Sequence, residues 1–140
     1  MTIKEIQNEI IDEFSMFDDW MQRYEYIIEL GKSLPLIEEQ YKTDENLIKG
    51  CQSKVWLQGE QNDDKIVFTA DSDAILTKGI IAILIRAFSN QKAEDIINAD
   101  TQFIDEIGLK EHLSATRANG LVSMIKNIKM YALAFNAKNN

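Results

Sequence analysis

Apolar residues recur at helical spacing in the first part of the chain. Thr2, followed three residues later by Glu5, has the pattern of a capping box and predicts the start of a first helix. Isoleucines and phenylalanines then recur three or four residues apart, which predicts one buried face. Asp18 and Asp19 suit the start of a second helix, and Gly31 is expected to end it in the left-handed conformation.

The middle of the chain changes from helical periodicity to short runs rich in β-branched and aromatic residues. Residues 54–58 and 65–69 have this composition, and the polar residues 59–64 lie between them. Two such runs joined by a polar turn predict an antiparallel hairpin within a small sheet.

The second half of the chain is predicted to be mainly helical. Ser72 or Asp73 could cap a strongly apolar helix over residues 74–88, which is expected to lie against the sheet. Short helices are expected over residues 93–98 and 101–107.

A long final helix is predicted after Ser114, which suits the capping position. Its apolar positions are Leu121, Met124, Ile125, Ile128, Met130 and Leu133. The pattern as a whole predicts an α+β fold in a single domain over residues 1–140, with helices packed on one side of a small antiparallel sheet.

Composition narrows the class of protein. Hydrophobic residues make up 45% and charged residues 27% of the 140 residues, as is usual for soluble globular proteins. The formal net charge of −8 disfavours nucleic acid and membrane surfaces as partners. The first residues lack the layout of a signal peptide, and no run of eighteen apolar residues occurs. We therefore expect a cytoplasmic protein.

Cys51 is the only cysteine and His112 the only histidine. A single cysteine excludes an internal disulfide and a Cys-rich metal or cluster site within one chain, so no metal site is predicted. Cys51 lies in a turn-like stretch between Lys49 and Lys54, and nearby cations favour the thiolate. A lone cysteine can equally be a small buried hydrophobe, and the local residues leave both interpretations open.

Two other residues are candidates for chemistry, each with a structural alternative. His112 is the only imidazole that could activate Cys51 as a hydrolytic nucleophile, but a histidine in this position is more often a solvated or capping residue. Arg117 lies in the first turn of the last helix, where a cation opposes the helix dipole. It is either an ordinary surface arginine or a contact for a partner or a carboxylate.

Several blocks of sequence together resemble the SufE family, which includes the CsdE branch. The resemblance covers about residues 16–135. The most specific block is Gly-Cys-Gln-Ser followed by Val-Trp, and the blocks occur in the family's order at residues 30–35, 48–57, 71–74, 78–79 and 113–121.

The resemblance implies both a fold and a function. The fold would be helices on a small antiparallel sheet, as in iron–sulfur scaffold proteins. Cys51 would accept persulfide sulfur and pass it on in iron–sulfur cluster assembly. The acceptor loop would include Gly50, Gln52 and Ser53, and the candidates for site support or a partner interface are Asp73, Arg117 and His112.

The resemblance also implies partners. The donor would be a PLP-dependent cysteine desulfurase of the SufS or CsdA type, stimulated by this chain, and the recipient an iron–sulfur scaffold complex of the SufBCD type. The chain would need no cofactor of its own, since PLP belongs to the desulfurase. We expect residues 50–53 to shelter Cys51 in the free protein. Two alternatives remain: a passive module that activates the desulfurase without carrying sulfur, and a scaffold that holds a metal or cluster itself.

Overall fold

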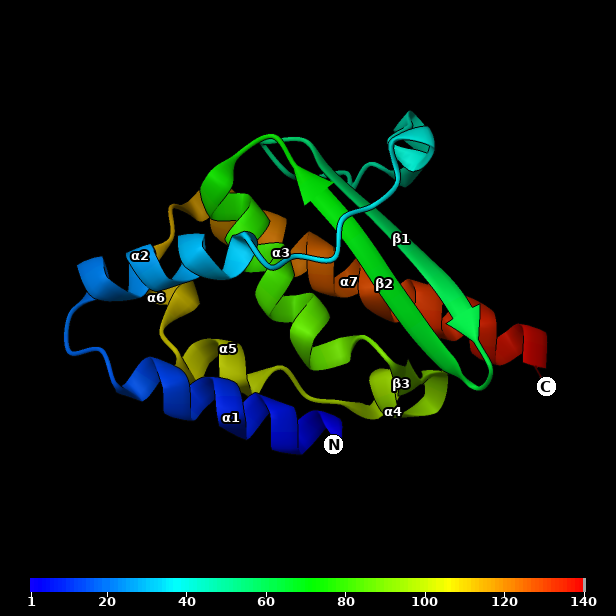
Figure 1. Ribbon diagram of the computed structural model, residues 1–140, viewed down its shortest axis with the longest axis horizontal. Helices are drawn as coiled ribbons and strands as arrows, with labels where there is room; N and C mark the ends of the chain where they lie inside the picture. Colours follow the sequence, from blue (N-terminus) through cyan, green and yellow to red (C-terminus); the bar gives the residue numbers. More distant parts are fainter. Residues whose placement is uncertain (140) are drawn as a thin grey trace.

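The computed structural model describes residues 1–139. Two helices come first along the chain, a β-hairpin follows, and the remainder is mainly helical, which is an α+β arrangement (Figure 1). The helices are α1 (Ile3–Ser15), α2 (Trp20–Gly31), α3 (Ile75–Phe88), α4 (Ala93–Asn98), α5 (Gln102–Glu106), α6 (Leu109–His112) and α7 (Ala115–Asn139). The strands are β1 (Val55–Asn62), β2 (Lys65–Ser72) and β3 (Gln91–Lys92), and two 3-10 turns precede them at Glu39–Tyr41 and Asp44–Asn46.

The predicted hairpin is present, but its strands are longer than expected. β1 and β2 pair antiparallel from Val55 opposite Ser72 to Asn62 opposite Lys65. The prediction of a turn over residues 59–64 is therefore wrong, because most of these residues belong to β1. Polar residues at the end of the hairpin continue the strand, and Asp63 makes the turn with a φ of 57°.

Two short segments extend the sheet along β2. β3 pairs antiparallel with its first residues and completes the strand order β1-β2-β3. Further along, Leu36 forms a parallel bridge with Ala70, and the Ile37 amide donates to the Ala70 carbonyl at 3.1 Å. The connection after α2 is thereby attached to the sheet.

The helix starts confirm two capping predictions and contradict one. Thr2 and Glu5 form the predicted capping box of α1, and the Asp19 carboxylate accepts from the Gln22 amide at the start of α2. α3 has no side-chain cap, because Ala74 occupies the capping position. The predicted capping by Ser72 or Asp73 is therefore wrong.

Glycines allow α2 and α3 to approach closely. A Cβ atom on Gly79 of α3 would lie 2.1 Å from the Ile27 carbonyl oxygen of α2, and one on Gly31 would lie 3.0 Å from the Gly79 amide nitrogen. Gly31 ends α2 without the expected left-handed conformation, since only Gly50 and Gly108 among the described glycines have positive φ. Its small size serves the helix crossing instead.

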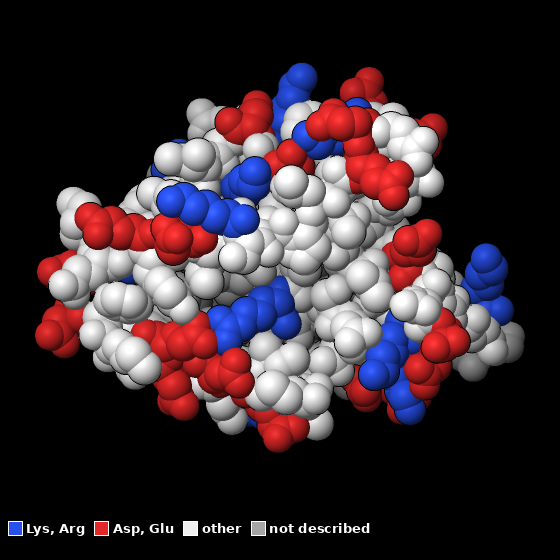
Figure 2. All heavy atoms as spheres, viewed as in Figure 1, with Lys and Arg blue, Asp and Glu red and all other residues white. Residues whose placement is uncertain are grey.

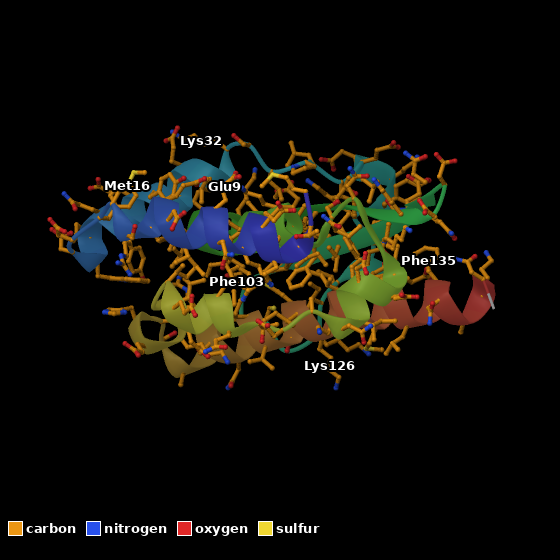
Figure 3. The ribbon with its side chains drawn as sticks, turned by 90° about the horizontal axis from the view of Figure 1, so that it is seen from below. Glu9, Met16, Lys32, Phe103, Lys126 and Phe135 are labelled. Atoms are coloured by element: carbon orange, nitrogen blue, oxygen red, sulfur yellow. The ribbon has the colours of Figure 1, made fainter. Side chains whose placement is uncertain are left out.

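Helices α3 and α7 cover one face of the sheet, as predicted (Figure 1). α3 is buried at most of its positions and contributes the largest share of the core. α7 lies on the opposite side of the molecule from α1, and Phe103 of α5 points into the space between these layers (Figure 3). The outer end of α7 differs from expectation, because Met130 and Leu133 are exposed.

Acidic side chains gather mainly along the margins of the face shown in Figure 2, and a basic side chain lies across its otherwise largely uncharged centre. α7 contains four basic residues and no acidic residue, although the whole chain is acidic. None of the helices within residues 1–139 combines the length and apolar character needed to cross a membrane.

Candidate functional site

Cys51 lies in a loop whose two ends are fastened to the sheet. The Ile48 amide donates to the Val55 carbonyl at 2.8 Å and closes the loop at its base. The Lys54 amide donates to the Asp73 carboxylate at 3.0 Å, while the Asp73 amide donates to the Lys54 carbonyl at 3.2 Å. Asp73 therefore joins the end of the cysteine loop to the segment between β2 and α3.

The middle of the loop contacts α7. Gly50 has a φ of 92°, a conformation that glycine adopts without strain. A Cβ atom there would lie 2.7 Å from the Ser123 hydroxyl oxygen. The Cys51 thiol donates to the Gly120 carbonyl across a Sγ–O distance of 3.6 Å. Gly120 permits this approach, because a Cβ atom on it would lie 3.3 Å from Sγ.

A cavity of about 10 Å³ adjoins Cys51. This volume is about what one water molecule requires. Three elements enclose it: the cysteine loop, α3 and the first turns of α7. Its lining consists of Cys51, Gln52, Ser53, Thr77, Ile80, Thr116, Arg117, Gly120 and Met124.

The half-buried position of Cys51 determines its acidity. Burial raises the pKa of the Cys51 thiol, because an apolar environment disfavours the thiolate. This direction is opposite to the one expected from Lys49 and Lys54. The thiol of the free protein is thus a weaker nucleophile than an exposed cysteine at the same pH.

The predicted site residues do not all lie together. Gln52, Ser53 and Arg117 line the cavity with Cys51. Asp73 is exposed and acts on the loop through Lys54 rather than through the cavity. His112 is not part of the lining: its Nδ1 lies 2.9 Å from the Gly108 carbonyl oxygen, and its ring stacks on Trp20 with centroids 4.1 Å apart.

Sequence reasoning missed several residues around Cys51. Thr77 and Ile80 come from the apolar α3, and Gly120 and Met124 come from α7. Two signals were present, namely a threonine within an apolar helix and a glycine within a long helix. Neither shows which loop it faces. Among residues 1–139, no group of three or more His, Cys, Asp or Glu residues is placed to hold a metal ion.

The family assignment rests on the chain as a whole. The family model described as "SufE: Fe-S metabolism associated domain" matches residues 8–132. The chain belongs to the SufE family. The predicted family membership is thereby confirmed, and with it an association with iron–sulfur metabolism.

Two SufE-like relatives resemble this chain over most of its length. An uncharacterized SufE-like protein of Rhizobium meliloti (strain 1021) is 45% identical over 130 residues, which are 89% of this chain and 93% of that protein. An uncharacterized SufE-like protein of Rhizobium etli is 42% identical over 127 residues, which are 87% of this chain and 86% of that protein.

A solved structure supports the fold. The solution structure of a hypothetical protein from Thermus thermophilus matches with a TM-score of 0.77 at 14% sequence identity. The match covers 92% of this chain and 94% of that protein. It confirms the α+β, SufE-like architecture and carries no information on chemistry.

Proposed function

We propose that this SufE-family protein accepts persulfide sulfur on Cys51 from a PLP-dependent cysteine desulfurase and delivers it to an iron–sulfur cluster scaffold. The observation that carries the proposal is the position of Cys51, half-buried beside a cavity of about 10 Å³. A space of this size suits one additional atom and is too small for a cluster. This favours a carrier over a scaffold.

The transfer follows the chemistry of thiol–disulfide exchange. The Cys51 thiolate attacks the outer sulfur of the desulfurase persulfide, a new Sγ–S bond forms, and the S–S bond of the donor breaks. The donor cysteine leaves as a thiolate with the electron pair. No other catalytic side chain is required, so the placement of His112 outside the cavity lining is compatible with this step.

Burial has two opposing consequences for the proposed role of Cys51. Burial protects a persulfide from oxidants and small thiols, but it also raises the pKa of the thiol. Docking to the desulfurase would have to expose Cys51 or supply charge that favours the thiolate. Gly50 provides the backbone freedom for such a loop movement.

Sulfur transfer by Cys51 requires a donor and a recipient. The donor would be a desulfurase of the SufS or CsdA type that this chain stimulates, and the recipient a scaffold complex of the SufBCD type. The chain itself would need no cofactor, since PLP remains on the desulfurase. The transfer would take place in the cytoplasm, where a lone thiol stays reduced.

Mass spectrometry after incubation with desulfurase and cysteine tests the proposal. Wild-type protein should gain the mass of one sulfur atom on the peptide containing Cys51. Cys51→Ser should gain none while retaining its fold and its binding to the desulfurase. If the wild type stimulated the desulfurase without gaining sulfur, the chain would be a passive activating module instead.

A further inference from the structure

Thr77 is one of two buried polar side chains within residues 1–139, the other being Gln7. The Gln7 amide has a partner, since its Nε2 donates to the Asp100 carbonyl at 2.9 Å. The Thr77 side chain is only 5% exposed. The fully buried polar side-chain atom that lacks a partner in these residues is Trp20 Nε1 and not the Thr77 hydroxyl, which therefore keeps some accessible surface.

The position of Thr77 shows what its hydroxyl can reach. Thr77 lines the cavity beside Cys51, next to the buried Ile80, Gly120 and Met124. The exposed members of the lining are Gln52, Thr116 and Arg117. The buried part of the lining is thus apolar except for one threonine.

The present partner of Cys51 suits a thiol but not an anion. The Gly120 carbonyl accepts the S–H of Cys51, and a carbonyl oxygen offers nothing to a negatively charged sulfur. A persulfide is more acidic than a thiol and carries its negative charge on the outer sulfur. Such a charge in a half-buried, apolar site needs a hydrogen-bond donor.

We infer that the Thr77 hydroxyl donates a hydrogen bond to the outer sulfur of the Cys51 persulfide and holds that sulfur in the cavity. The inference rests on the proposed function, because it concerns the loaded state of the same cysteine. It makes Thr77 a positioning residue for the carried sulfur rather than a catalytic one.

The test loads Cys51 chemically, so that it does not depend on a desulfurase. A polysulfide ion supplies the sulfur: the Cys51 thiolate attacks one of its S–S bonds, the Sγ–S bond forms, and a shorter polysulfide leaves with the electron pair. The near-ultraviolet absorbance of the persulfide anion is then followed against pH. The pKa of the persulfide is the quantity measured.

Three variants separate the hydroxyl from the shape of the side chain. Thr77→Val keeps the shape and removes the donor, so its persulfide should titrate about one pH unit above the wild type. Thr77→Ser keeps the donor and should titrate close to the wild type. Thr69→Val makes the same chemical change on β2, outside the cavity, and should have no effect.

Folding does not complicate the comparison. The hydroxyl of Thr77 has no partner among the described residues of the unloaded protein, so Thr77→Val should have an unchanged or higher midpoint of thermal unfolding. Equal persulfide pKa values in the wild type and Thr77→Val would overturn the inference and leave the carrier function intact. Failure of polysulfide to load the wild type would overturn it too. If the pKa shifts but the desulfurase cannot load Cys51, the hydrogen bond stands and the proposed function falls.

Discussion

At the residue scale, the contact between Gly50 and Ser123 holds the cysteine loop against α7. Gly50 combines a positive φ with a distance of 2.7 Å from a hypothetical Cβ atom to the Ser123 hydroxyl oxygen. A side chain at this position therefore meets two separate obstacles. One is the backbone conformation, which costs an L-residue about 1 kcal/mol or more, and the other is the steric contact with α7.

Gly50→Ala should lower the free energy of unfolding by about 1 to 3 kcal/mol and increase the rate at which iodoacetamide alkylates Cys51. The rate should rise because the displaced loop no longer shelters the thiol. Urea unfolding and timed mass spectrometry measure the two effects.

A double variant separates the two obstacles at Gly50. Adding Ser123→Ala to Gly50→Ala removes the steric contact and should recover part of the stability, while the conformational cost remains. Ser123→Ala alone is the control. Full recovery in the double variant would show that the positive φ of Gly50 is unimportant.

At the element scale, a cluster of ionic groups joins α1 to α2 and α3. Arg86 of α3 donates to Glu13 of α1 at 2.7 Å and to Glu9 at 2.8 Å, and the Tyr26 hydroxyl of α2 also donates to Glu13. The hydrogen bond from Arg86 is the main reason why the pKa of Glu13 lies below its ordinary value of 4.5. Burial raises this pKa, and the hydrogen bond from Tyr26 lowers it further. Desolvation and the Glu13 carboxylate together raise the pKa of Tyr26 to about 12.

The lowered pKa of Glu13 makes stability depend on pH in a defined direction. The folded protein binds the proton of Glu13 less tightly than the unfolded chain does. The stabilisation of the fold by the ionised Glu13 carboxylate is therefore complete above pH 4.5 and is lost as the pH falls. Glu13→Gln should cost about 1 to 2 kcal/mol of unfolding free energy near neutral pH and clearly less at about pH 3.

Urea unfolding at a series of pH values measures this difference. Glu29→Gln is the matched control, because Glu29 pairs with Lys32 in an exposed ion pair that contributes little. A constant difference between wild type and Glu13→Gln across the pH range would contradict the role given to the Glu13 carboxylate.

The elements also show where sequence reasoning succeeds and where it fails. The capping box at Thr2 and the cap at Asp19 could be predicted, because the groups that form them are a few residues apart. The end of β1 could not be predicted, because polar residues on an exposed strand have the same composition as a turn. Met130 and Leu133 fit the helical period of α7, but no second element covers them.

At the scale of the whole molecule, the site is assembled from segments that are distant in sequence. Cys51, Thr77 and Gly120 come from a loop, α3 and α7 and meet only in the folded protein. Sequence motifs singled out Cys51 and its loop as candidates, because those residues are adjacent. They could not show that Thr77 faces the cavity, that His112 stacks on Trp20, or that burial raises the pKa of Cys51.

The presence of a single cysteine in the whole chain has a consequence for a carrier. A second thiolate close to a loaded Cys51 could attack its Sγ, form an internal disulfide and release the outer sulfur as hydrosulfide with the electron pair. Thr116 lines the same cavity, so Thr116→Cys introduces such a thiol. After loading with polysulfide, this variant should release sulfide about tenfold faster than the wild type and become oxidised to a disulfide.

Ser15→Cys is the matched control for this experiment, because it places the extra thiol at the end of α1, outside the cavity lining. Its sulfide release should stay close to that of the wild type at low protein concentration, where encounters between molecules are rare. Equal rates for Thr116→Cys and Ser15→Cys would show that proximity to the cavity does not matter. Faster sulfide release from Thr116→Cys alone would instead explain why isolation of Cys51 from other thiols suits the proposed role of sulfur carrier.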